Sequence, residues 1–134
     1  KLTIITAGVT KDCPNGHLQF GPKNANHYQR LINSLEEKEK TLVTVYEFEQ
    51  YKKGLHKKLL IVDGEQIFAG SSNLDYKCLV LMGDHEMNFK ATSKKLAEQT
   101  LKIIKQDIQH SRLVYPSRSL SGHQLKNLWP ISNL

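Results

Sequence analysis

The sequence is poor in cysteine and has no long apolar run. Its 2 cysteines, Cys13 and Cys78, are too few and too far apart for a disulfide framework or a zinc site, so reduced thiols are expected. No apolar run is long enough to cross a bilayer, and the N-terminus lacks the pattern of a secretory signal peptide. No internal repeat or low-complexity tract is present. These absences argue against a disulfide-stapled scaffold, a repeat protein and a transmembrane helix.

Composition and charge fit a globular domain with an anionic partner. The 134 residues favour a single domain over residues 1–134, and 39% hydrophobic with 24% charged residues is ordinary for a folded chain. The net charge of +6 and the pI near 9.3 favour an anionic partner, most simply one that carries phosphate. The chain opens on Lys1 inside the strand-like KLTIIT, so we expect a piece of a longer protein. Its location stays open, with membrane association through that parent as one option.

Strands and helices alternate along the chain. Short β-branched and apolar runs predict strands, and apolar residues at helical spacing predict two helices, over about Ala25 to Lys38 and about Lys94 to His110. Ser93 is the expected N-cap of the second helix. Strands are predicted at residues 1–6, 41–48, 55–63, 65–70 and 86–90, with a turn at Asp63-Gly64. The pattern predicts an α/β fold, a mixed β-sheet flanked by helices in a sandwich, with Leu128 and Trp129 anchoring the tail.

Polar residues gather at the ends of two predicted strands in GLHKKLLIVDGEQIFAGSSNLD, residues 54–75. Within a strand His56 and Lys58 would project from one side and Lys57 from the other. If the two strands pair as a hairpin, the turn after Gly70 returns toward His56. A histidine, a lysine and hydroxyl or amide donors meet the needs of phosphoryl transfer, in which charge develops on the nonbridging oxygens.

This pattern resembles the HKD signature of the phospholipase D superfamily. The sequence has His56-x-Lys58, then four residues, Asp63, six residues and Gly70-Ser71-x-Asn73. Six fixed identities would match by chance roughly once in 10⁸ starting points. VYEF before the motif and HEMNF after it also look like the C-terminal half of bacterial cardiolipin synthases. The likeness is specific over about Thr41 to Phe89, weak before it, and absent from the tail.

The resemblance implies a role for each matching residue. In this family one motif histidine attacks phosphorus to form a phosphohistidine, and the other protonates the leaving alcohol, so His56 would take one of these roles. Lys58 and Asn73 would hold the nonbridging oxygens, and Ser71 would hydrogen-bond within the site. Glu86 resembles the acid that orients the motif histidine, although Asp84 competes for that role. Asp63 would support the base of the pocket or serve only as a turn residue, and no metal or other cofactor is implied.

Only one HKD motif is present, whereas the active site of this family needs two. The second half would come from the same parent chain or from a second copy in a homodimer. Likeness to C-terminal halves favours the parent chain, and His56 would then be the general acid.

For several other residues, a structural or surface role is as good an interpretation as a functional one, or a better one. Cys13, His17 and His27 match no zinc spacing, and His85 and His123 are expected at the surface or in hydrogen bonds. The lysines beside the motif, Lys52, Lys53 and Lys57, form either a phosphate-attracting rim or a solvated face. The aromatic residues Tyr46, Phe48 and Tyr51 line either a groove or, more often for alternate strand positions, the core.

Three functions follow from different classes. The first is a phospholipid-processing phosphodiesterase or phosphatidyltransferase, with CLVLMG as its candidate membrane-binding loop. The second is a metal-independent nuclease with nucleic acid as its partner, which the net charge favours. The third is a catalytically silent binding module, against which the intact motif argues.

Overall fold

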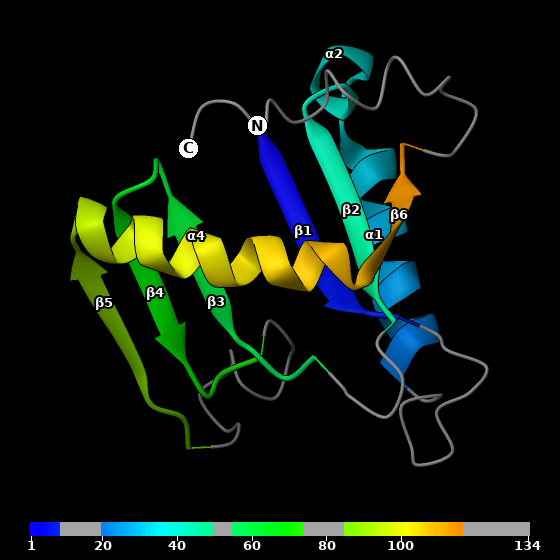
Figure 1. Cartoon of the computed structure of the whole chain (residues 1–134). Coiled ribbons are helices and arrows are strands. Elements are labelled where there is room, and N and C mark those ends of the chain that lie inside the picture. Colours follow the sequence, from blue (N-terminus) through cyan, green and yellow to red (C-terminus); the bar gives the residue numbers. More distant parts are fainter. Residues whose placement is uncertain (9–19, 50–54, 74–84, 117–134) are drawn as a thin grey trace. The chain divides into compact units, whose positions relative to one another are not determined.

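The computed structural model describes residues 1–8, 20–49, 55–73 and 85–116 (Figure 1). These residues fall into two compact units. The first contains Lys1–Leu55 and Lys105–Leu134, and the second contains His56–Ile104. Each unit has its own three-stranded sheet, and helices complete an α/β fold, as the sequence predicts. The prediction of a single domain over residues 1–134 stays a prediction.

The sheet of the first unit is mixed. Strands β1 (Leu2–Ala7) and β2 (Val43–Phe48) pair in parallel, and β6 (Ser111–Tyr115) pairs with β2 in the antiparallel direction, which gives the order β1-β2-β6. The central strand β2 is buried along almost its whole length, and Val45 has 0% of its surface exposed. Residues on both faces of β2 are covered, so its polar residues Thr44 and Glu47 are buried together with Val43, Val45 and Phe48.

Helix α1 (Phe20–Ser34) supplies the other part of this core. Its Ile32 forms a buried cluster with Val43 and Val45, and Tyr28, Leu35 and Val114 pack against that cluster. The helix ends four residues before the predicted Lys38, and the separate short helix α2 (Glu37–Lys40) follows. The break has a local cause, because Glu36 and Glu39 form a capping box that starts α2.

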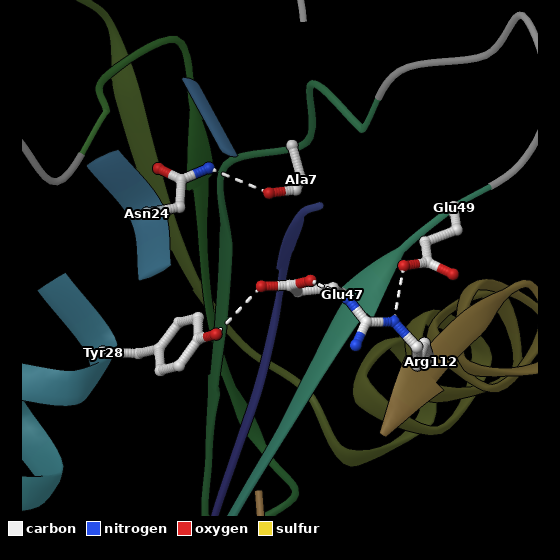
Figure 2. A network of polar contacts seen from close by, with 6 residues as sticks. All are labelled: Ala7, Asn24, Tyr28, Glu47, Glu49 and Arg112. Carbon is white, nitrogen blue, oxygen red and sulfur yellow. Dashed lines mark hydrogen bonds and ion pairs between the residues drawn. The ribbon is translucent and has the colours of Figure 1, made fainter. Parts of the chain in front are cut away.

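A partly buried polar network joins the helix to the sheet of this unit (Figure 2). The Tyr28 hydroxyl donates to Oε1 of Glu47 at 2.9 Å, and Nη2 of Arg112 bonds Oε2 of the same carboxylate at 2.7 Å. The Glu47 side chain is only 5% exposed, so both oxygens of a buried carboxylate have partners. Nε of Arg112 also bonds Oε1 of Glu49 at 2.6 Å.

The sheet of the second unit is an antiparallel meander. Strands β3 (Leu59–Val62), β4 (Gln66–Gly70) and β5 (Asn88–Thr92) pair in that order, with Ile61 opposite Ile67 and Ile67 opposite Ala91. The predicted turn at Asp63-Gly64 is confirmed. Both residues have positive φ, 52° and 70°, which is the signature of a type I′ hairpin turn.

Helix α4 (Lys94–Gln109) follows β5, and the predicted helix is confirmed. Ser93 caps it as predicted, because its Oγ accepts the Leu96 N–H at 3.2 Å. Ala97 on this helix and Ile67 on β4 are the buried apolar residues in the described part of the second unit. None of the helices in the described ranges is long and apolar enough to span a membrane.

One predicted strand needs correction, and one observed strand is missing from the prediction. The strand predicted over residues 55–63 begins only at Leu59, so His56 and Lys58 precede it and the alternation of strand side chains does not apply to them. Strand β6 was not predicted, because SRLVY is short and lies directly behind a long helix. The tail with Leu128 and Trp129 lies outside the described residues.

Candidate active site

Three segments of the motif region meet at one end of the β3–β4–β5 sheet. Strand β3 begins just after Lys58, β4 ends at Gly70, and β5 begins at Asn88. Because neighbouring strands are antiparallel, these three positions lie at the same end of the sheet. The Gly70 N–H donates to the Lys58 carbonyl at 3.3 Å, and Gly70 lies opposite Asn88. The sheet register therefore joins the His-x-Lys segment, the Gly-Ser-x-Asn segment and the segment that carries Glu86.

His56 and Lys58 lie at this end of the sheet, on the segment just before β3. His56 is exposed and Lys58 is half-buried. The Lys58 ammonium turns back along the chain and donates to the His56 carbonyl at 2.9 Å. This hydrogen bond brings the Lys58 ammonium to the backbone of His56, outside any strand pairing.

Ser71 is tied to the strand opposite it through both its backbone and its side chain. Its N–H donates to the Met87 carbonyl at 3.0 Å, and its Oγ accepts the Met87 N–H at 3.0 Å. Asn73, two residues further along, is exposed. The segment that carries both residues is thus held directly against the chain that follows Glu86.

Glu86 is half-buried and immediately precedes Met87, the residue to which Ser71 is bonded. This puts Glu86 on the segment next to Ser71. The predicted hydrogen bond between Glu86 and His56 stays a prediction. Asp84, the competing acid, lies outside the described residues.

Asp63 lies in the hairpin turn at the opposite end of the sheet. It is exposed, and the four residues of β3 separate it from Lys58. Lys58 and Asp63 are therefore five residue steps apart, which at about 3.3 Å each span roughly 16 Å. The positive φ of Asp63 fits the turn that it shares with Gly64, so this placement favours the turn interpretation over a contact with the reacting groups. A catalytic contribution from Asp63 stays a prediction.

No group of three or more His, Cys, Asp or Glu residues that could hold a metal ion occurs in the described ranges. His27 and His85 are exposed. Cys13, His17, Cys78 and His123 lie outside these ranges, as do Lys52, Lys53, Tyr51 and the CLVLMG segment. Lys57 is exposed beside the motif, whereas Tyr46 and Phe48 lie on the central strand β2 of the first unit.

Comparison with known families decides the family of this chain. A family model described as "Cardiolipin synthase, PLD-like domain" matches residues 1–108. The chain belongs to this phospholipase D-like family. Searches of curated proteins and of solved structures each gave no match. Phospholipase D-like domains are in general enzymes that hydrolyse or transfer phosphodiesters.

The family match extends further than the resemblance seen in the sequence. It covers β1, α1 and most of α4 in addition to the motif region, so the likeness to the family includes residues 1–40. The match ends at residue 108, two residues before His110, and thus leaves out the tail.

Sequence reasoning missed two polar residues at the candidate site. Nδ2 of Asn88 donates to Oγ of Ser72 at 2.5 Å, and Oδ1 of Asn88 accepts the Ser72 N–H at 3.3 Å. The only signal in the sequence was the position of Ser72 inside the motif and of Asn88 two residues after Glu86. Neither position implies that the two side chains meet until the pairing of β4 with β5 is known.

Proposed function

We propose that this phospholipase D-like chain supplies half of a metal-independent phosphodiesterase or phosphatidyltransferase site that acts on phospholipids. One observation supports the proposal most directly. Three segments that carry His56, Lys58, Ser71, Asn73 and Glu86 meet at one end of the β3–β4–β5 sheet. The family match supports the reaction class. A second motif, from the same parent chain or from a second copy, completes the site.

The reaction proceeds in two balanced steps. In the first, a nitrogen of the nucleophilic histidine forms a bond to phosphorus, the ester P–O bond breaks, and the other histidine gives its proton to the leaving alkoxide. In the second, that histidine accepts a proton from water or from an acceptor alcohol. The oxygen of this acceptor bonds phosphorus and the P–N bond breaks. The likeness to C-terminal halves favours His56 as the histidine that donates and later accepts the proton.

Lys58 and Asn73 stabilise the negative charge that develops on the nonbridging oxygens. The Lys58 ammonium, held beside the His56 backbone at 2.9 Å, supplies a fixed cation, and the Asn73 amide supplies hydrogen-bond donors. Ser71 holds its segment in place through Met87. In this proposal Glu86 orients the His56 ring, as the resemblance implies. In this scheme protein side chains neutralise the phosphoryl charge.

The first test measures turnover of phosphatidylglycerol in EDTA by the full chain and, if a longer parent protein exists, by that parent, each compared with a His56→Ala variant. We expect the substitution to lower kcat by at least about 10³-fold, because it removes a group that transfers a proton in both steps. The matched control is His27→Ala, an exposed histidine on α1. Turnover that survives His56→Ala but remains insensitive to EDTA would refute the proposal.

A nuclease is the second candidate, and the net charge of +6 favours it. The same proteins are therefore assayed on single-stranded DNA at increasing salt. Cleavage that requires His56 and falls steeply with salt, with no turnover of phospholipid, would assign nucleic acid as the substrate.

A further inference from the structure

We propose that Asn88 is a positioning residue. Its hydrogen bonds to Ser72 hold the segment with Ser71 and Asn73 in the conformation that the reaction needs. This inference rests on the proposed function, because it assigns Asn88 to the same site. Asn88 is neither part of the HKD pattern nor one of the residues to which the resemblance gave a role.

Asn88 and Ser72 form two hydrogen bonds, and each residue donates one and accepts the other. The Ser72 N–H donates to Oδ1 of Asn88 at 3.3 Å, and Nδ2 of Asn88 donates to Oγ of Ser72 at 2.5 Å. A backbone N–H is only a donor, so it requires the amide oxygen on its side and leaves the NH₂ group for the hydroxyl. The two bonds therefore fix both the backbone and the side chain of Ser72.

Gly70 makes this approach possible. A β-carbon at position 70 would collide with Oδ1 of Asn88 and with the Met87 carbonyl oxygen. The absence of a side chain allows the Asn88 amide to reach across to the segment that follows β4. Gly70 and Asn88 also lie opposite each other in the sheet register.

Ser72 is the residue between two proposed site residues, Ser71 and Asn73. Ser71 is hydrogen-bonded to Met87, and Ser72 is hydrogen-bonded to Asn88. Two adjacent residues are thus attached through side chains to the chain at the start of β5. Asn73 follows immediately and is exposed, so its direction depends on the backbone of Ser72. A displacement of about 1 Å in such a group can cost about 100-fold in rate.

The test combines Asn88→Ala, Ser72→Ala and the double variant in the EDTA phospholipid assay. We expect Asn88→Ala to lower kcat by roughly 10- to 100-fold with little change in KM, because the proposed role of Asn73 is in the transition state. The double variant should lose little more than Asn88→Ala alone, since Ser72→Ala removes only one of the two hydrogen bonds that Asn88→Ala already removes. Ser72→Thr, which keeps the hydroxyl, should retain activity.

Thr92→Ala is the matched control, because Thr92 is another exposed polar residue on β5 and lies at the other end of the strand. Wild-type kcat in Asn88→Ala, in a protein whose activity His56→Ala abolishes, would overturn the positioning role and leave the proposed function intact. Losses in the two single variants that multiply in the double variant would also overturn it.

A second measurement does not depend on activity. Amide hydrogen exchange of the full chain, resolved by NMR, directly reports the hydrogen bond from the Ser72 N–H to Asn88. In Asn88→Ala we expect the Ser72 amide to exchange about tenfold faster, while the Ala91 amide within the β4–β5 pairing is unchanged. Unchanged exchange at Ser72 would overturn the proposal.

Discussion

At the scale of single residues, Tyr28 and Glu47 show how burial sets protonation. Burial, followed by the hydrogen bond to Glu47, raises the pKa of Tyr28 to about 12, against an ordinary value of 10.0. Both causes disfavour a phenolate, because the charge would be desolvated and would face a carboxylate. The phenol therefore keeps its proton in the folded protein at pH values where an unfolded chain would lose it.

This shift predicts a loss of stability in alkali. Because the folded pKa is raised, the contribution of Tyr28 is fully present below pH 10 and is lost as the pH rises toward 12. Urea unfolding between pH 9 and 11.5 should show a steeper fall in the free energy of unfolding for the native sequence than for Tyr28→Phe. Parallel curves for the two proteins would contradict this prediction. Tyr115→Phe serves as the comparison tyrosine in the same unit.

At the scale of elements, the start of α4 depends on one side chain. The Ser93 hydroxyl accepts the Leu96 N–H at 3.2 Å, and the Ser93 carbonyl accepts the Ala97 N–H at 2.9 Å. Only the first of these bonds uses the side chain. The hydroxyl therefore satisfies a donor that the helix itself cannot pair.

We expect Ser93→Ala to lower the free energy of unfolding by about 1 kcal/mol, since a lost N-cap typically costs that much. Ser93→Asp, which keeps a capping oxygen, should restore most of it. The matched control is Ser34→Ala, whose hydroxyl donates to the Leu31 carbonyl near the end of α1. Urea denaturation measures all three, and a loss in Ser34→Ala as large as in Ser93→Ala would argue against the capping explanation.

Elements with a strong local signal could be predicted, and those defined by partners could not. Helix α4 has a clear apolar period and an N-cap, and the β3–β4 hairpin has an Asp-Gly turn, so both follow from the sequence. Strand β6 depends on pairing with β2, more than 60 residues earlier, as in the pair of Glu47 with Arg112. No local pattern in SRLVY reports that partner.

The candidate site divides in the same way. The identities and spacing of the motif point to His56, Lys58, Ser71 and Asn73, and their roles stay a prediction, whereas the family match shows only the phospholipase D-like family. The distance of Asp63 from the other motif residues and the contact between Asn88 and Ser72 depend on sheet register. Register is set by cross-strand packing, which one strand's sequence does not contain.

At the scale of the whole molecule, Arg112 links distant parts of the first unit. It joins β6 to Glu47 and Glu49, and through Glu47 to Tyr28 on α1. The Arg112 side chain is 44% exposed, whereas that of Glu47 is only 5% exposed. Losing the guanidinium would leave a buried carboxylate without its cation.

We expect Arg112→Met to lower the free energy of unfolding by about 2 kcal/mol, less than for a fully buried pair because Arg112 is partly exposed. Glu49→Gln, which touches only the more exposed arm of the pair, should cost under about 1 kcal/mol. Urea denaturation compares the two. Equal losses, or no loss in Arg112→Met, would show that the Glu47 carboxylate does not depend on this cation.

The order of strands along the chain also governs how the protein can assemble during synthesis. Strands β3, β4 and β5 are consecutive and end at Thr92, so their pairing joins segments that are close in the sequence, with 3 residues between β3 and β4 and 17 between β4 and β5. In the described residues β6 is the last strand of the β1–β2–β6 sheet, so its pairing with β2 can form only when Tyr115 has emerged from the ribosome. Low contact order favours fast folding. The strands that carry the candidate active site can therefore pair while the other sheet still lacks its final strand.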